Sequence, residues 1–167
     1  MGNYLSLPVL AIAAILQSSL TPRFSILGGR PDLVFLLVLS WALNAPLEQG
    51  VVWAFVGGIL LDLMSAAPLG TSVIGMIIIV FVLDIFRQQI YRVGVGTIMW
   101  TVLAGTLFQQ ATVMVMLLLA GFKVPILDNV GYVVLPSVFY NFVLIFPVYF
   151  FMRRLQKRVI GRERFFS

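Results

Sequence analysis

The sequence predicts an all-α membrane protein with six transmembrane helices. Of its 167 residues, 61% are hydrophobic and 10% are charged, and the mean hydropathy is +1.08. A soluble domain has about 45–50% apolar and about 25% charged residues, so this chain has too few charges to cover a surface that faces water. No polar run is long enough to form a separate soluble domain. We therefore expect one membrane domain over residues 1–152 and a basic cytoplasmic tail over residues 153–167.

Hydrophobic runs separated by turn residues place the helices. The first run covers about residues 4–20 and lacks a basic start and a small-residue cleavage site, which predicts a retained span. The second helix starts at Pro31, a favourable first-turn residue, and ends near Asn44. At 1.5 Å per residue it covers about 21 Å, less than a bilayer core of about 30 Å. We therefore expect the connector TPRFSILGGR before it to enter the membrane depth, surrounded by protein.

The four remaining helices follow from the same pattern. They are expected at about residues 46–66, 70–86, 94–121 and 133–152. The third begins with Pro46 and carries Glu48 in its first turn, where the helix dipole favours an acidic side chain. An even number of spans places both termini on the same side of the membrane.

Basic residues are concentrated on one predicted side of the membrane. Six of the eleven lie in the last fifteen residues. With six spans, eight lie on the side of the termini and three on the other, namely Arg23, Arg30 and Lys123. The positive-inside rule therefore predicts that both termini are cytoplasmic. The tail also offers candidate contacts with anionic lipid, which are Arg153, Arg154, Lys157 and Arg158.

Small residues recur every four positions in the third helix and lead to a carboxylate, in the order Gly50, Ala54, Gly58 and Asp62. This spacing follows one helix face and allows a neighbouring backbone to approach closely. A carboxylate at mid-bilayer costs about 2.5–3.5 kcal/mol. We expect Asp62 to offset this cost by pairing with Arg23 or Arg30, which are the arginines predicted on its side of the membrane. Asp32 is a second candidate for such a pair.

A second stripe of small and polar residues follows the fifth helix, as Thr101, Gly105, Gln109 and Thr112. We expect Gly105 and Gln109 to serve helix packing. Gln109 and Thr112, together with Asn141 of the sixth helix, are expected to form hydrogen bonds between helices and not contacts with a substrate.

Two stretches resemble the MreD family of bacterial rod shape-determining proteins. They are LQSSLTPRFSILGGRPDLVFLLVLSWAL (16–43) and AFVGGILLDLMSAAPLGTS (54–72). The matching features are Arg30-Pro31-Asp32-Leu33, Gly57-Gly58, Asp62 and Pro68-Leu69-Gly70. The resemblance is strongest over about the first 75 residues, because the later helices match only in hydropathy.

This resemblance implies a non-enzymatic scaffold of the cell-elongation machinery that builds side-wall peptidoglycan, located in the bacterial cytoplasmic (inner) membrane. Its implied partner is MreC, a single-span protein with a large periplasmic part, near MreB, RodA and the elongation penicillin-binding transpeptidase. The implied fold is similar to the substrate-binding subunits of energy-coupling-factor vitamin transporters. The bundle would hold the MreC helix in a groove of small and apolar side chains. A polar cluster would shape its outer side, formed by Arg30, Asp32, Asp62, Gly58 and Gly70.

Two other functions compete with the scaffold. A vitamin-binding transporter subunit docks through an Ala-x-x-x-Ala pattern on its first helix, where this chain has only Ala14 and Ser18. A membrane enzyme would need clustered catalytic groups, but the chain has no cysteine or histidine, and Asp62 and Asp84 are predicted near opposite leaflets. We therefore expect no enzyme activity, no cofactor, no metal and no nucleic-acid partner. The stoichiometry with MreC, the face that binds it, a ligand inside the bundle and a signalling role are left open.

Overall fold

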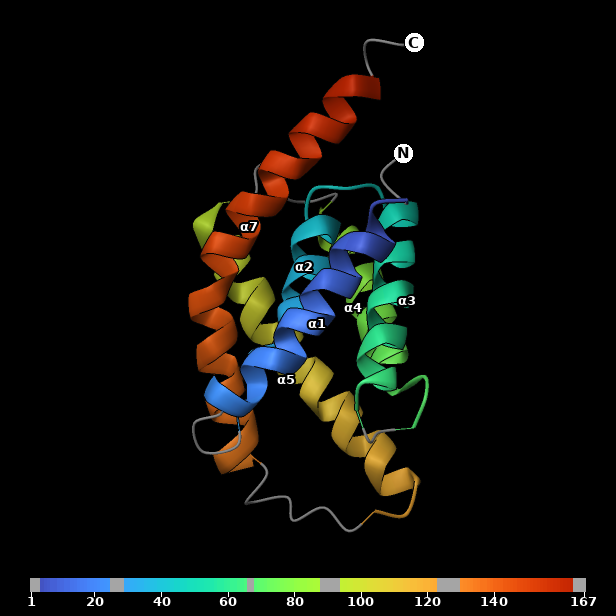
Figure 1. Ribbon diagram of the computed structural model, residues 1–167, viewed down its shortest axis with the longest axis vertical. Coiled ribbons are helices and arrows are strands. Elements are labelled where there is room, and N and C mark those ends of the chain that lie inside the picture. Colours follow the sequence, from blue (N-terminus) through green and yellow to red (C-terminus); the bar gives the residue numbers. More distant parts are fainter. Residues whose placement is uncertain (1–3, 25–28, 66–67, 88–93, 123–129, 164–167) are drawn as a thin grey trace.

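The computed structural model describes residues 4–24, 29–65, 68–87, 94–122 and 130–163, and its regular structure there is all helical (Figure 1). The elements in chain order are α1 (Ser6–Phe24), α2 (Leu33–Ala42), α3 (Leu47–Leu63), α4 (Thr71–Arg87), α5 (Val95–Leu119), a π-helical turn η1 (Val130–Val134) and α7 (Leu135–Glu163). Over the described ranges, the prediction of six α-helices is confirmed. Most helix ends lie within two or three residues of the expected ones, which is the usual uncertainty of such ends.

The boundary between α1 and α2 differs from the prediction. Helix α1 continues to Phe24, so the first four residues of the expected irregular connector are helical. Helix α2 begins at Leu33 and not at Pro31, because Asp32 acts as its N-cap and accepts the Phe35 N–H at 3.0 Å. Between the two helices, the described residues Gly29 and Pro31 are buried. Protein therefore covers these two residues, whereas the side chain of Arg30 between them is exposed.

Helix α2 forms the centre of the bundle. Every residue from Val34 to Ala42 is buried. Helices α1, α3, α4 and α7 pack around it. A helix that is apolar on nearly all sides is stable only when other elements cover it. Near its end, Trp41 stacks on Trp53 of α3 with ring centroids 4.2 Å apart, and both side chains are fully buried.

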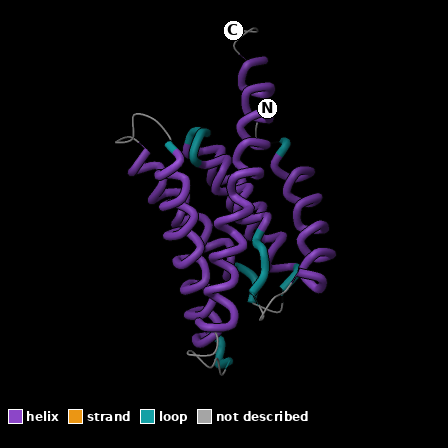
Figure 2. The backbone as a smooth tube through the Cα atoms, turned by 90° about the vertical axis from the view of Figure 1, so that its left-hand side faces the viewer, coloured by secondary structure: helices purple, strands orange, loops and turns teal. Residues whose placement is uncertain are grey.

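Successive helices run in alternating directions, so the start of α1 and the end of α7 lie at the same end of the bundle (Figure 1). We call this the terminal end and the opposite one the far end. The far end contains the start of α2 and the α3–α4 turn. Helix α5 crosses the bundle obliquely, and the last turns of α7 extend beyond the other helices (Figures 1 and 2).

The distribution of side chains fits a lipid environment. Several buried residues are polar, among them Asp62, Thr106 and Asn141, whereas many large apolar side chains are exposed on the outside, such as Phe139 at 68%. Large apolar surfaces of this kind are rare on soluble monomers. Two described segments, Val95–Leu119 and Val130–Arg158, are long and apolar enough to cross a membrane. That the shorter apolar helices also cross it stays a prediction.

Helix α7 extends much further than predicted. It was expected to end near residue 152 but continues to Glu163, so most of the predicted basic tail is helical. Arginine, lysine and glutamine are good helix formers, and the helix continues through Gly161 to Glu163. The extension is also fixed to the bundle, because Gln156 Nε2 donates to the Trp41 carbonyl of α2 at 3.1 Å.

Candidate functional site

Asp62 is buried at the far end of the bundle, in the last turn of α3, with 2% of its surface exposed. Its Oδ2 accepts the Gly70 N–H at 2.7 Å, and its Oδ1 accepts the Ser72 N–H at 2.9 Å. These donors lie at the start of α4, where backbone N–H groups lack partners within the helix and the helix dipole favours negative charge. The α4 N-terminus therefore stabilises the carboxylate.

The expected arginine partner of Asp62 is not found among the described side chains. Arg30 is exposed, and the hydrogen bonds of the Asp62 carboxylate go to backbone N–H groups. The side chain of Arg23 lies outside the described residues. The turn that brings the backbone donors to Asp62 depends on Gly70, whose φ of +98° is in the left-handed region that favours glycine.

The small residues of α3 lie against α4. A Cβ atom on Gly58 would lie 2.5 Å from Val73 Cα, and one on Gly50 would lie 2.9 Å from Val80 Cγ1. Ala54, between the two glycines, is fully buried. The absence of larger side chains therefore allows the two helices to approach closely, and Gly58 meets backbone atoms of α4 where Gly50 meets a side chain.

A second set of hydrogen bonds holds the start of α2. The Asp32 N–H donates to Asn141 Oδ1 of α7 at 3.0 Å, and the Val34 N–H donates to Gln17 Oε1 of α1 at 3.1 Å. The Gln17 amide also hydrogen-bonds the Asp32 carboxylate. Side chains from α1 and α7 therefore satisfy the free N–H groups of the α2 N-terminus and connect the three helices.

Arg30 contributes its backbone to this set of hydrogen bonds. Its N–H donates to Ser137 Oγ of α7 at 3.1 Å, while its side chain is exposed. The preceding Gly29 packs directly against Pro136 and Ser137, with no room for a Cβ atom. The Arg30 cation is thus free to face the surroundings of the protein, and its main chain is fixed against α7.

Helix α5 connects the two sets of hydrogen bonds. Asn141 Nδ2 donates to Thr106 Oγ1 at 3.2 Å, and one turn later Gln109 Nε2 makes a long contact of 3.5 Å with the Ser72 carbonyl of α4. Gly75 of α4 leaves the space that the Gln109 amide occupies. We call the resulting arrangement the polar layer. Its members are Gln17, Asp32, Asp62, Ser72, Thr106, Gln109, Ser137 and Asn141.

The expected stripe on α5 is divided between different surroundings. Gly105 and Gln109 are buried, and a Cβ atom on Gly105 would lie 3.1 Å from Phe35 Cζ of α2. Thr112 donates to the Phe108 carbonyl of its own helix at 2.9 Å. Thr101 lines an open groove, so this stripe does not form a continuous packing face.

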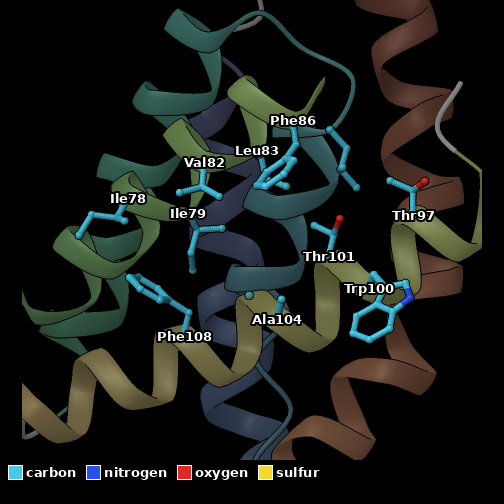
Figure 3. Close-up of a pocket in the computed structure, with 12 residues that line it drawn as sticks. Ile78, Ile79, Val82, Leu83, Phe86, Thr97, Trp100, Thr101, Ala104 and Phe108 are labelled. Carbon is cyan, nitrogen blue, oxygen red and sulfur yellow. The ribbon is translucent and has the colours of Figure 1, made fainter. Parts of the chain in front are cut away.

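The groove lies between α4 and α5, toward the terminal end of the bundle (Figure 3). Its volume is about 510 Å³. The residues that line it are Leu43 of α2's C-terminal cap, Ile78, Ile79, Val82, Leu83 and Phe86 of α4, and Thr97, Trp100, Thr101, Ala104, Gly105 and Phe108 of α5. Its lining is almost entirely apolar, because only the threonine hydroxyls and the indole N–H are polar side-chain groups.

The shape of the groove suits an elongated apolar ligand. Along α5 it extends from Thr97 to Phe108, which is about 16 Å or three helical turns. The small side chain of Ala104 lies between the larger side chains of Trp100 and Phe108 (Figure 3), and Gly105, next to it in the chain, also lines the groove. Trp100 is 73% exposed. A helix face or an acyl chain fits such a surface. A polar small molecule would need more converging polar groups.

The basic residues expected to contact anionic lipid are all exposed on α7 at the terminal end, namely Arg153, Arg154, Lys157 and Arg158. Phe150 and the first three of them line a shallow recess of about 230 Å³. Met152 and Gln156 are buried on the other side of the helix. The basic residues are therefore separate from both the polar layer and the groove.

Ser72, Thr106, Ser137 and Trp100 were not singled out from the sequence. Serine and threonine are common in membrane helices, where they often bond to their own backbone, so their presence alone does not mark a site. Asn141 was the usable signal, because a buried amide in an apolar helix needs partners. Among the described residues, no group of three acidic, cysteine or histidine side chains could hold a metal ion.

Comparison with known proteins gives one family match and no structural one. The family described as rod shape-determining protein MreD matches residues 1–159, nearly the full chain. No solved structure matches the chain.

Proposed function

The chain belongs to the MreD family of rod shape-determining proteins, and from this premise we propose that it is a scaffold that binds the membrane helix of MreC. The family is non-enzymatic, so this membrane protein acts in rod-shape determination without a catalytic site. Its work must then be done by binding. The described surface offers a groove of the right chemical character for a membrane helix.

The apolar groove between α4 and α5 is the observation that supports this proposal most. In lipid, helices associate through close van der Waals packing, which small residues at the contact favour. Ala104 and Gly105 supply such residues, and the hydroxyls of Thr97 and Thr101 offer hydrogen bonds to a partner helix. The length of about 16 Å accommodates three turns of the MreC helix, about half of a bilayer core.

The orientation in the membrane is part of the proposal. The positive-inside rule assigns the terminal end, with its basic α7 extension, to the cytoplasm. The groove then lies in the inner half of the membrane and the polar layer in the outer half. On this assignment, Arg30, Asp32, Asp62, Gly58 and Gly70 shape the outer side, where MreC leaves the membrane.

The wider assembly follows from the same family membership. We propose that the MreC-bound chain acts beside MreB, RodA and the elongation penicillin-binding transpeptidase, in the bacterial cytoplasmic membrane. The similarity of fold to the substrate-binding subunits of energy-coupling-factor transporters belongs to the proposal as well. The corresponding rival function, vitamin binding, is disfavoured because the groove has few polar groups to orient a vitamin.

The first test is co-purification of MreC from the same bacterium through a tag on this chain, in mild detergent. We expect MreC to co-elute and to be lost when its membrane helix is deleted. Retention of a vitamin by a chain that fails to bind MreC would favour the transporter function instead.

A matched pair of variants tests the groove itself. Ala104→Phe fills the floor of the groove, whereas Ala111→Phe adds the same ring at another exposed alanine of α5, outside the groove lining. We expect Ala104→Phe to lower the co-eluting MreC by about tenfold, the effect of losing 1.4 kcal/mol of binding, and Ala111→Phe to leave it unchanged. Equal retention by the two variants would place the MreC site elsewhere.

A further inference from the structure

The exposed surface of α7 changes abruptly from apolar to basic. Phe139 and Val143 are more than half exposed, and so are Phe150 and Phe151 at 58% and 59%. Side chains of this kind belong at the depth of the lipid acyl chains. Arg153, two residues later, begins the exposed basic segment, so its cations lie at the depth of the lipid headgroups.

The basic side chains have a fixed direction, because the opposite side of the helix is attached to the bundle. Met152 is fully buried and Gln156 is 4% exposed. The hydrogen bond from Gln156 Nε2 to the Trp41 carbonyl, at 3.1 Å, joins this part of α7 to α2. The first basic turns are therefore part of the folded bundle, and their cations point away from it.

Three of these cations and one ring surround the recess of about 230 Å³ described above, formed by Phe150, Arg153, Arg154 and Lys157. On a helix, positions 153, 154 and 157 lie within a sector of about 100°. Like charges four residues apart repel each other, and no described carboxylate forms an ion pair with any of the three. An anion in the recess would relieve this repulsion.

We propose that this recess binds the phosphate group of an anionic phospholipid in the leaflet at the terminal end. The three cations would contact the phosphodiester, and Phe150 would contact the adjoining glycerol and acyl chains. A zwitterionic lipid is a poorer ligand because its own ammonium group neutralises the phosphate. The site is independent of MreC and of the groove, so it stands or falls separately from the proposed scaffold function.

The test uses the purified full-length chain and native mass spectrometry. The chain is titrated with phosphatidylglycerol and with phosphatidylcholine of identical acyl chains. We expect the first bound phosphatidylglycerol to be held at least about fivefold more tightly. Equal affinity for the two lipids would overturn the proposal and leave the basic face to an acidic protein partner.

Two single variants locate the site. Arg154→Gln removes a cation of the recess, and Arg158→Gln removes the same charge one turn further along the same helix, outside the recess lining. We expect Arg154→Gln to lower the affinity for phosphatidylglycerol about fivefold and Arg158→Gln to lower it less than twofold. An equal loss of affinity in both variants would mean that the overall charge of the helix attracts the lipid, and it would overturn the proposed binding site.

Two further measurements keep the result decisive. A C-terminal reporter checks that each variant keeps its orientation, since basic residues also direct insertion. If a variant inserts in the opposite orientation, the proposal is decided by the affinities of the unaltered chain for the two lipids. Excess inorganic phosphate should not displace phosphatidylglycerol. Displacement by phosphate would show an anion site that does not recognise lipid.

Discussion

Helix α4 meets two of its neighbouring helices, α3 and α5, in opposite ways. Against α3 it packs closely along small residues, and the Asp62 carboxylate joins the two helices at the far end. Against α5 it makes contact near Gly75 and Gln109 and then leaves a groove of about 510 Å³ toward the terminal end. We call the first contact the closed seam and the second the open seam.

The difference shows what keeps a helix pair closed in lipid. Apolar area gives no reason to bury a helix face there, because lipid tails are as apolar as the side chains. The closed seam has glycines that admit the neighbouring backbone and a carboxylate bonded to it. Apart from Ala104 and Gly105 on its floor, the open seam has large side chains on both helices, so its apolar walls remain available to a partner.

The largest expected effect comes from opening the closed seam. Gly58→Ala places a Cβ atom 2.5 Å from Val73 Cα, and only a shift of the whole α4 backbone can relieve the contact. We expect a loss of about 2–3 kcal/mol in the free energy of unfolding, measured by denaturation in mixed detergent. Gly96→Ala, in open space at the start of α5, should be neutral or up to about 1 kcal/mol more stable. Similar values for the two variants would contradict the close approach.

The second effect tests the carboxylate at the end of the same seam. Asp62→Asn keeps the shape of the side chain but turns its amide NH₂ toward one of the two backbone donors. The N–H of Gly70 or of Ser72 is then buried without an acceptor. We expect a loss of about 1–3 kcal/mol in unfolding free energy. Glu48→Gln, at an exposed position in the first turn of α3, should cost less than about 1 kcal/mol. A neutral Asp62→Asn would show that the backbone contacts do not hold the turn.

The third effect concerns the start of α2, which lies at the far end of the bundle. Asn141→Leu removes the acceptor of the Asp32 N–H and the donor to Thr106. We expect a loss of about 1–2 kcal/mol and faster hydrogen exchange of the Asp32 amide. Tyr149→Phe, which removes only a 3.3 Å bond to the exposed Asn44, is the control. Unchanged exchange in Asn141→Leu would contradict the bonding of the α2 terminus by α7.

The smallest expected effect on stability belongs to the open seam. Ala104 is exposed on the floor of the groove, so Ala104→Phe should change the unfolding free energy by no more than about 0.5 kcal/mol. Denaturation of the isolated chain measures this change. A large loss of stability would mean that the groove closes in the free protein, and the contrast between the two seams would fail.

Spacing along the chain predicted the closed seam well. Positions 50, 54, 58 and 62 share one helix face whatever surrounds it, so their common burial could be foreseen. The partner of Asp62 could not, because the donors are backbone N–H groups and every residue except proline carries one. Only the path of the turn through Gly70 brings them to the carboxylate.

The groove and the length of α7 could not be predicted from the sequence, for different reasons. The angle between α4 and α5 depends on how all the helices pack, and no local pattern encodes it. The predicted end of α7 is wrong because a run of charged residues is typical of a tail, although arginine, lysine and glutamine also favour a helix. Gln156 attaches this segment to α2 through the Trp41 carbonyl, and nothing in the local sequence distinguishes it from an exposed glutamine.

The central position of α2 also determines when, during synthesis, the bundle can finish folding around it. Its ten residues span about 15 Å, half of the hydrocarbon thickness, so α2 cannot cross the bilayer as an independent unit. Its two ends are bonded to residues 109 and 115 positions later in the chain, Asn141 and Gln156. The ribosome must therefore release α7 before α2 reaches its final surroundings. A chain cut short before α7 would present an uncovered, incompletely bonded helix to the proteases that remove unfinished membrane proteins.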